Sequence, residues 1–370
     1  MKKILTIIGA RPQFVKAAVV SRAMQQKPVK FKEIIVHTGQ HYDANMSQVF
    51  FDEMQIPTPD YHLEIGGGSH GEMTGKMLIK IEEVIVKEKP DVVLVYGDTN
   101  STLAGALAAV KLHIPVAHVE AGLRSYNRMM PEEHNRVLTD HVSDYLFCPT
   151  ETAVENLSKE GLAPCALRLT PQVFNTGDVM YDAFLFYSEL AKEKSTIIHN
   201  LNLEDNDFIL CTIHRAENTD DQERLRNIFE ALNEIAQEKT IILPMHPRTR
   251  KILSDKSLTP CALRLEPNLQ LIDPVSYFDM LMLLKNSQLV MTDSGGVQKE
   301  AFYAKKPCVT MRDETEWVET VTGGYNMIVG ANKERILSGS QAMMNCQADF
   351  SQKLYGNGAA GELIVQSLIK

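Results

Sequence analysis

Short apolar runs rich in valine, isoleucine and leucine recur along the chain and are separated by amphipathic stretches. An apolar run of this length is typical of a buried strand, and apolar positions repeated every three or four residues are typical of a helix. The predicted strands span residues 3–8, 33–36, 91–96, 114–119, 145–148, 208–213, 240–245, 269–272, 288–291, 307–310 and 326–329. The clearest predicted helices span residues 76–88, 101–112 and 225–238.

Strands that alternate with helices indicate parallel sheets, because the helices carry the crossovers between neighbouring strands. We therefore predict an α/β protein with two doubly wound, Rossmann-like domains, at residues 1–175 and 176–355. The join is placed where Thr170-Pro171 and Thr176-Gly177-Asp178 interrupt the pattern. Such sheets bind ligands beyond the carboxyl ends of their strands, so two facing domains would place a site in the cleft between them.

Composition and charge narrow the functional class. Of 370 residues, 44% are hydrophobic and 23% charged, and 38 basic against 47 acidic residues leave a net charge of −9, which argues against nucleic-acid binding. No apolar stretch is long enough for a membrane span, and the amino-terminal run is too short for a signal peptide. The six cysteines form no CxxC pair, and several lie in apolar runs, which favours buried thiols in a reducing cytoplasm.

A basic turn follows the first predicted strand. In Gly9-Ala10-Arg11-Pro12 the glycine permits a tight turn and the proline suits the start of a helix. Free backbone N–H groups, Arg11 and Lys16 would therefore gather at a helix N-terminus, which is a site for anions. The alternative is a plain strand-to-helix turn with surface cations.

A small-residue turn follows the predicted strand at 288–291. Close backbone approach would let Ser294, Gly295 and Gly296 bind a diphosphate, and Glu300 could accept hydrogen bonds from ribose hydroxyls. The alternative is ordinary helix capping by Asp293 or Ser294. A Walker A motif is missing from the sequence, which disfavours a kinase.

Acidic residues follow strands in the first half of the chain. Asp98 and Glu120 close consecutive apolar runs, which aims both carboxylates into one crevice, and Glu132 follows soon after. Carboxylates that share a cleft can divide acid and base roles, because repulsion and burial separate their pKa values. The alternatives are capping by Thr99 and its neighbours, and an ion pair between Glu120 and Arg124.

His214 follows the predicted strand at 208–213 and could stabilise a departing diphosphate from the second domain. A single histidine is otherwise more often structural. The histidines and cysteines show no metal-ligand spacing such as HExxH, so we expect no catalytic metal.

Six ordered motifs together resemble the non-hydrolysing UDP-N-acetylglucosamine 2-epimerase family over essentially the whole chain. They are Gly9-Ala10-Arg11-Pro12, Gly97-Asp98-Thr99, His118-Val119-Glu120-Ala121-Gly122-Leu123-Arg124, Pro131-Glu132-Glu133-His134-Asn135-Arg136, Asp293-Ser294-Gly295-Gly296 and Met311-Arg312-Asp313-Glu314-Thr315-Glu316. The resemblance implies a GT-B-like fold, a homodimer, UDP held mainly by the second domain, and a last helix at 356–370 that returns to the first domain. It also implies epimerisation by elimination of UDP to a 2-acetamidoglucal and re-addition, without a redox cofactor, as a step toward surface polysaccharide precursors.

The resemblance assigns roles by position. It implies catalysis by Asp98, Glu120, Glu132 and His214. It implies substrate or UDP binding by Arg11, Gln13, Lys16, Arg136, His246, Ser294, Gly295, Gly296 and Glu300. Gln13 stands where many members that act on UDP-N-acetylglucosamine have glutamate, and it looks like the branch that epimerises UDP-2,3-diacetamido-2,3-dideoxyglucuronate. The alternative is that Gln13 only stabilises the first helix turn.

Other functions fit parts of this pattern. A hydrolysing 2-epimerase would share the fold and motifs, a GT-B glycosyltransferase would share the UDP-binding half, and a UDP-sugar sensor would bind without catalysis. The segment Gln40-His41-Tyr42-Asp43 also aligns with a region that binds a second UDP-sugar as activator in some relatives, although Tyr42 departs from their wording.

Overall fold

The computed structural model describes residues 1–39, 58–162, 171–204, 207–245, 249–250, 252 and 265–369. The chain divides into two compact units. The first unit contains Met1–Leu185 and Lys353–Lys370, and the second contains Phe186–Gln352. The sequence analysis placed the join at residue 175, and the contacts assign the first part of the long helix α7 (Val179–Lys194) to the first unit.

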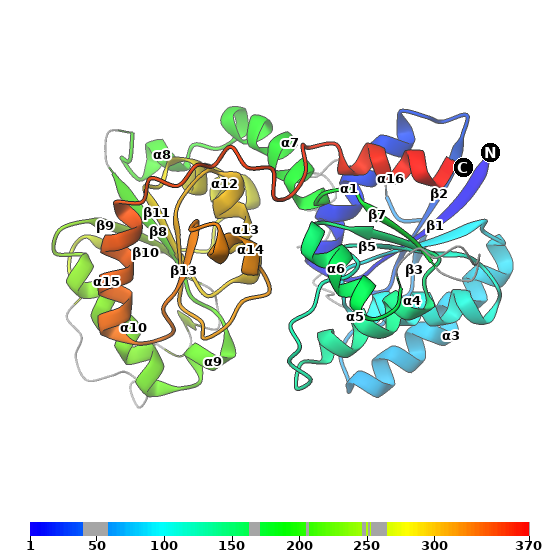
Figure 1. The fold of residues 1–370 in the computed structure, drawn as a ribbon, viewed down its shortest axis with the longest axis horizontal. Coiled ribbons are helices and arrows are strands. Elements are labelled where there is room, and N and C mark those ends of the chain that lie inside the picture. Colours follow the sequence, from blue (N-terminus) through cyan, green and yellow to red (C-terminus); the bar gives the residue numbers. More distant parts are fainter. Residues whose placement is uncertain are drawn as a thin grey trace. The chain divides into compact units, whose positions relative to one another are not determined.

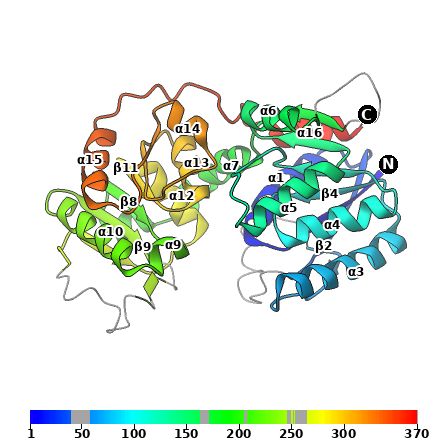
Figure 2. The ribbon, with the colours of Figure 1, turned by 60° about the horizontal axis from the view of Figure 1, so that its bottom comes forward.

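The first unit is built on a seven-stranded parallel sheet with the order β3-β2-β1-β4-β5-β6-β7. Its strands are β1 (Lys2–Ile8), β2 (Phe31–His37), β3 (Tyr61–His62), β4 (Val92–Tyr96), β5 (Val116–Val119), β6 (Tyr145–Cys148) and β7 (Gln172–Asn175). Its helices are α1 (Arg11–Gln25), α3 (His70–Glu88), α4 (Asn100–Lys111), α5 (Pro131–Val142), α6 (Glu151–Lys159) and α16 (Ala360–Ile369). Figure 1 shows α1 and α16 on one face of the sheet and α3, α4 and α5 on the other. The last three lie side by side in Figure 2.

The pleat of the strands explains the core of this unit. Alternate residues of β1, Leu5 and Ile7, pack with Val93 and Val95 of β4 against helices α3 and α4. Helix α4 lies very close to the sheet, because a Cβ atom on Gly105 would lie 2.7 Å from Ile7 Cδ1. The other residues of each strand point to the opposite face of the sheet, which is also covered. Every position of such a strand is therefore apolar, and the strands appear as continuous apolar runs in the sequence.

The carboxyl-terminal helix α16 packs on α1 of the first unit. A Cβ atom on Gly361 would lie 2.7 Å from Val19 Cγ1, so only glycine allows this approach. The Gly361 N–H donates to Asp182 Oδ2 at 2.9 Å, and Lys2 Nζ donates to the Leu368 carbonyl at 2.8 Å. The last helix is therefore an integral part of the first unit.

The second unit is built on a six-stranded parallel sheet with the order β10-β9-β8-β11-β12-β13. Its strands are β8 (Phe208–Thr212), β9 (Thr240–Pro244), β10 (Leu269–Ile272), β11 (Leu289–Thr292), β12 (Cys308–Thr310) and β13 (Asn326–Ile328). Its helices are α8 (Ile197–Asn200), α9 (Ala216–Thr219), α10 (Gln222–Ile235), α12 (Tyr277–Asn286), α13 (Gly295–Tyr303), α14 (Val318–Thr322) and α15 (Lys333–Met344). One apolar layer lies between the sheet and α10 with α15, and another lies between the sheet and α8 with α12.

Every strand predicted from the sequence is present, and the predicted fold class of two parallel-sheet α/β domains is confirmed. Strands β3 and β7 were not predicted; β7 lies where the sequence analysis placed the join between domains. In each unit the strand order reverses direction at one strand, β1 in the first unit and β8 in the second. These switch points mark the edges where ligands of such sheets bind.

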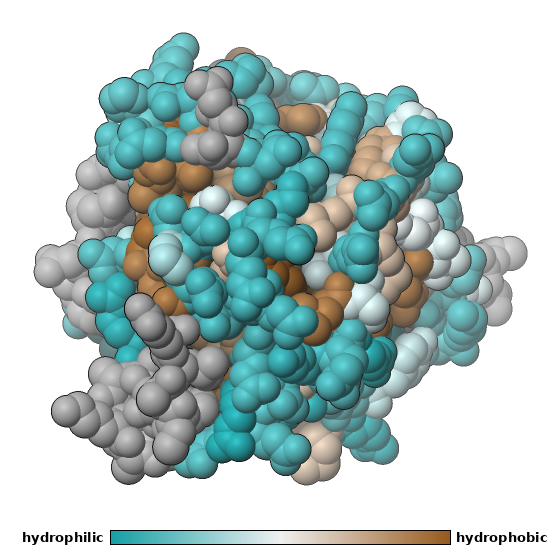
Figure 3. Space-filling model, turned by 90° about the vertical axis from the view of Figure 1, so that its left-hand side faces the viewer, coloured by the Kyte–Doolittle hydropathy of each residue, from teal (hydrophilic) through white to brown (hydrophobic). Residues whose placement is uncertain are grey.

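The face drawn in Figure 3 is mainly hydrophilic, with smaller apolar areas between the polar side chains. Among the helices of the described ranges, none has the length and apolar character that crossing a bilayer requires.

Candidate active site

Asp98 lies directly beyond the carboxyl end of β4, in a turn made by Gly97 with φ of +62°. The Arg136 guanidinium on α5 contacts Asp98 Oδ2 and also lies 3.1 Å from Glu133 Oε2. Burial lowers the pKa of Arg136, but the charges of Asp98, Glu133 and Glu120 together outweigh burial and raise it. Arg136 is therefore a fixed cation among three carboxylates.

Glu120 lies beyond the carboxyl end of the neighbouring strand β5, and its Oε2 contacts Lys16 Nζ on α1. A Cβ atom on Gly97 would lie 3.2 Å from Lys16 Nζ and 3.7 Å from Glu120 Oε2, so glycine leaves room for this pair. The backbone of Glu120 has φ of +71°, a conformation that costs a non-glycine residue about 1–3 kcal/mol. The alternative pairing with Arg124 is wrong, because Arg124 bonds to Asp140 and Glu160 instead.

The two adjacent glutamates at the start of α5 have different surroundings. Glu133 is buried and accepts hydrogen bonds from the Ser125 and Tyr126 N–H groups, both at 2.9 Å. Glu132 is exposed. Glu133 therefore fixes the loop before α5, whereas the Glu132 carboxylate is accessible to a ligand.

Gln13 joins the turns after β1 and β4. Its Oε1 accepts the N–H groups of Gly9 at 2.8 Å and Ala10 at 3.0 Å, while its Nε2 donates to the Tyr96 carbonyl at 2.8 Å. The side chain is 1% exposed. The contacts are those of the alternative in which Gln13 stabilises the first helix turn, and its role in substrate choice stays a prediction.

The second unit places His214 beyond the carboxyl end of β8, where a buried carboxylate holds it. Asp293 accepts the N–H groups of His214 and Arg215, each at 3.0 Å, and the amide of Asn218 at 3.3 Å. His214 Nδ1 lies 3.3 Å from Asp293 Oδ1, and the His214 side chain is 35% exposed whereas that of Asp293 is fully buried. Asp293 therefore orients the imidazole, a role that the sequence analysis missed because it considered this residue only as a cap.

Helix α13 begins after Ser294, whose side chain makes no capping hydrogen bond. Its hydroxyl and the N–H groups of Gly295 and Gly296 lie at the positive end of the helix, which suits a phosphate. A Cβ atom on Gly295 would lie 3.7 Å from Arg215 Nη2. Arg215 is a cation at this turn that the sequence analysis did not propose.

Glu300 lies further along α13, and its side chain is buried. The next loop adds Arg312, which follows β12 and pairs with Glu316 at 3.1 Å. Arg312 is buried, which lowers its pKa, but Glu316 and then Glu217 outweigh burial and raise it. Lys299 Nζ lies 4.0 Å from the centre of the Trp317 ring. The described part of this edge thus carries several cations at one helix start.

Arg11 and His246 are two further predicted site residues. Arg11 is the first residue of α1, as the strand-to-helix turn required. His246 lies outside the described residues. No group of three or more histidine, cysteine, aspartate or glutamate side chains within the described ranges could hold a metal ion.

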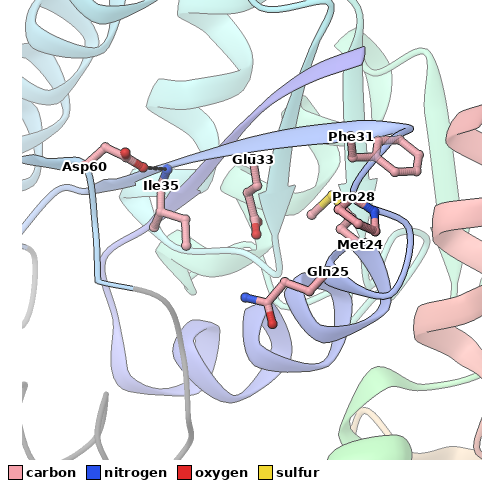
Figure 4. Close-up of a pocket in the computed structure, with 7 residues that line it drawn as sticks. All are labelled: Met24, Gln25, Pro28, Phe31, Glu33, Ile35 and Asp60. Carbon is pink, nitrogen blue, oxygen red and sulfur yellow. Dashed lines mark hydrogen bonds between the residues drawn. The ribbon is translucent and has the colours of Figure 1, made fainter. Parts of the chain in front are cut away.

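A cavity of about 270 Å³ in the first unit lies apart from these residues (Figure 4). It adjoins the carboxyl end of α1, whereas Gln13 and Lys16 belong to the first half of that helix. The Glu33 carboxyl lines the cavity and accepts a hydrogen bond from Thr6 at 2.6 Å. Burial raises the pKa of Glu33 to about 7. This cavity contains none of the predicted catalytic residues.

Comparison with known proteins shows the family to which the chain is similar. A family described as UDP-N-acetylglucosamine 2-epimerase matches residues 22–369. A UDP-2,3-diacetamido-2,3-dideoxy-D-glucuronate 2-epimerase of Pseudomonas aeruginosa is 55% identical, with 100% of this chain and 99% of the relative covered. A UDP-N-acetylglucosamine 2-epimerase of Methanocaldococcus jannaschii is 48% identical, with 99% and 98% covered. The crystal structure of the Methanocaldococcus jannaschii UDP-GlcNAc 2-epimerase with UDP-GlcNAc and UDP has a TM-score of 0.86 at 47% identity, with 99% of both chains covered.

Proposed function

The chain belongs to the UDP-N-acetylglucosamine 2-epimerase family, and on that premise we propose that it inverts C2 of a UDP-linked 2-acetamido sugar without net hydrolysis. It is thus an isomerase. The observation that carries the proposal is that Asp98 and Glu120 each lie beside a cation at the carboxyl edge of one sheet. Such pairs place carboxylates next to positive charge, an arrangement that suits an acid–base reaction on a charged substrate.

The chemistry dictates an order of bond breaking. The C2 proton of a pyranose has no adjacent carbonyl, so a carboxylate cannot remove it directly at a reasonable cost. Loss of UDP from C1 builds positive charge there and makes the C2 proton acidic, and the product of both steps is a 2-acetamidoglucal. Return of UDP to C1 with a proton delivered to the opposite face of C2 completes the inversion.

We assign the acid–base steps to Asp98, Glu120 and Glu132, and stabilisation of the departing diphosphate to His214. Because Asp293 holds Nδ1 of His214, the other ring nitrogen, Nε2, is the one we assign to the substrate. The residues of the two units are proposed to serve one reaction.

Diphosphate binding is assigned to cations and helix starts, and binding of the ribose hydroxyls is assigned to the Glu300 carboxylate. The proposed residues are Arg11, Lys16, Arg136, His246, Ser294, Gly295, Gly296 and Glu300. The Ser294 hydroxyl makes no capping hydrogen bond to α13, and Arg215 lies nearby. Both features support the binding of a phosphate at the start of α13. Lys16 would exchange its contact with Glu120 for the diphosphate, which would leave Glu120 available as a base.

Incubation with UDP-N-acetylglucosamine in deuterated water tests the proposal. We expect deuterium at C2 in both epimers, with free UDP well below the amount of product. Free UDP that accumulates in step with turnover would instead indicate a hydrolysing enzyme. Binding of both UDP-N-acetylglucosamine and UDP-2,3-diacetamido-2,3-dideoxyglucuronate without exchange at C2 would indicate a sensor. Asp98→Asn, Glu120→Gln and His214→Ala should each keep the fold and lower turnover about 100-fold or more.

A second substrate has its own support. The relative of 55% identity is a UDP-2,3-diacetamido-2,3-dideoxy-D-glucuronate 2-epimerase, and Gln13 replaces a carboxylate with a neutral amide near the anion-binding turn. We propose this uronate as the preferred substrate, since less negative charge favours a substrate that carries a carboxylate. Steady-state kinetics with both UDP-sugars decides it, because a higher kcat/KM for UDP-N-acetylglucosamine would refute the preference.

The setting of the reaction is also proposed. We expect a cytoplasmic homodimer that supplies surface polysaccharide precursors and needs no redox cofactor. Light scattering of the purified protein tests the dimer. A second UDP-sugar as activator would show as a sigmoidal dependence of rate on substrate concentration, and a hyperbolic dependence would contradict it.

A further inference from the structure

His118 lies on β5 between the two turns that carry Asp98 and Glu120, and its side chain is fully buried. Its Nε2 lies 2.7 Å from the Gly97 carbonyl oxygen, and its Nδ1 lies 2.7 Å from Asp140 Oδ1. The parallel pairing of β4 with β5 creates this geometry, because Tyr96 is the register partner of Val119. Neither the sequence analysis nor the proposed mechanism assigns a role to this histidine.

The two partners determine the charge of the ring. A carbonyl oxygen accepts hydrogen bonds and cannot donate, and an ionised carboxylate is likewise only an acceptor. A neutral imidazole would therefore point a nitrogen lone pair at one of them across 2.7 Å. Two N–H donors satisfy both contacts, and a ring with two N–H groups is the imidazolium cation.

Asp140 is ionised, which the argument requires. Its Oδ2 accepts Arg124 Nη1 at 2.7 Å and the Gly122 N–H at 3.1 Å. Burial alone would raise the pKa of Asp140, but contact with His118 and Arg124 outweighs burial and lowers it.

Charge balance supports the same conclusion. Arg124 also donates from Nε and Nη2 to the two carboxylate oxygens of Glu160, both at 2.7 Å. His118, Asp140, Arg124 and Glu160 thus form a chain of alternating charges, which sums to zero only if His118 is a cation. An unbalanced charge would be costly at the inner end, where the side chains of His118, Asp140 and Arg124 are at most 1% exposed.

Other titratable groups lie beside this network of four charged side chains but supply no proton to it. Burial and the nearby Asp140 raise the pKa of the Cys148 thiol, so it stays neutral. His141 lies 3.9 Å from Glu160 at the outer end of the chain and is 44% exposed.

The network holds both turns of the proposed site. The His118 ring fixes the carbonyl of Gly97, the residue before Asp98, and Asp140 fixes the N–H of Gly122, two residues after Glu120. Glu120 has a positive φ angle, which is strained for a non-glycine residue, so its turn needs external bonds to persist. We propose that His118 is a positioning residue that donates from both ring nitrogens and so fixes the turns carrying Asp98 and Glu120.

The protonation state can be measured without any assay of activity. In the full-length protein with ¹⁵N-labelled histidine, the His118 signal is identified as the one missing from His118→Phe. We expect both ring nitrogens of His118 to carry a proton in the folded protein, because each faces a hydrogen-bond acceptor at 2.7 Å. A His118 ring that carries only one proton would overturn the proposal.

The positioning role rests on the proposed function and is tested by kinetics. His118→Phe keeps a planar aromatic ring and removes both donors, and we expect kcat to fall about 10- to 100-fold with KM changed only a few-fold. In Asp140→Asn, a neutral His118 ring can still donate from Nε2 to the Gly97 carbonyl, while Nδ1 accepts a hydrogen bond from the new amide. The kcat of this variant should therefore be closer to that of the wild type than the kcat of His118→Phe is. His199→Ala is the matched control, with kcat unchanged.

The two measurements separate the possible failures. Wild-type kcat in folded His118→Phe, or an Asp140→Asn variant no more active than His118→Phe, would overturn the positioning role. Lack of epimerase activity in the wild type itself would refute the proposed function and leave the NMR result standing.

Discussion

The Asp293 carboxylate both accepts backbone N–H groups and orients the His214 ring, and two replacements of Asp293 separate these effects. Asp293 is fully buried and accepts the backbone N–H groups of His214 and Arg215. Asp293→Ala leaves both donors without this acceptor. A buried donor without a partner costs about 1–3 kcal/mol, so two cost about 4 kcal/mol, a large part of a typical stability of about 5–15 kcal/mol.

Asp293→Asn is the more informative variant. Its amide oxygen can keep the bonds to the two N–H groups, so the loss of stability should be about 1 kcal/mol. Its amide nitrogen would then face His214 Nδ1 and donate to it, which forces the proton onto Nε2 and removes the interaction that favours an imidazolium. We therefore expect turnover to fall about 100-fold or more in a folded protein, with UDP affinity reduced less than turnover.

The assays are urea unfolding followed by circular dichroism, kcat and KM for the UDP-sugar, and calorimetric binding of UDP. Asp273→Asn is the control, because this aspartate is 83% exposed and pairs with Arg250 at the surface, where an ion pair contributes about 0–1 kcal/mol. Wild-type turnover in Asp293→Asn would refute the view that Asp293 orients His214. Unchanged stability in Asp293→Ala would refute the assigned hydrogen bonds.

Three further predictions concern the first unit. Burial raises the pKa of Glu33 from 4.5 to about 7, so the charged form of this side chain destabilises the fold. The free energy of unfolding of the wild type should therefore fall by about 3 kcal/mol as pH rises from 4.5 through 7. Glu33→Gln should remove this pH dependence in urea unfolding experiments. Gly361→Val should lower the unfolding free energy by about 1–3 kcal/mol, since the new side chain meets Val19, and an unchanged melting temperature would contradict the packing of α16 on α1. Gly122→Ala should cost about 2–4 kcal/mol by calorimetry, because φ is +79° and the Cβ would lie 2.4 Å from the Ala153 carbonyl oxygen; a cost below 1 kcal/mol would argue against this turn.

The strands were predictable because parallel strands covered on both faces must be apolar throughout. All five residues of β4 (Val92–Tyr96) and of β8 (Phe208–Thr212) are buried, which produces the uninterrupted runs. Strand β3 has only two residues, and β7 is half-buried to exposed, so neither produces such a run. Both are edge strands of the sheet, where burial on two faces is incomplete.

Placement of the acids at strand ends was also predictable, because it follows from the positions of the apolar runs. The partners of those acids were not. The pair of Lys16 with Glu120 joins residues 104 positions apart, and the contact of His118 with Gly97 depends on strand register. Sequence position suggested a pair between Glu120 and Arg124, but competition from Asp140 and Glu160 determines where Arg124 goes.

Helix α16 completes the first unit but is synthesised after the second unit. The whole second unit, Phe186–Gln352, leaves the ribosome before this helix exists, so Val19 and its neighbours on α1 stay uncovered until residues 360–369 have been added. Co-translational folding normally lets the amino-terminal domain mature first. Here the nascent second unit can complete its folding before the first unit does. A stalled chain that lacks residues 360–369 would expose the apolar surface of α1 to chaperones and proteases.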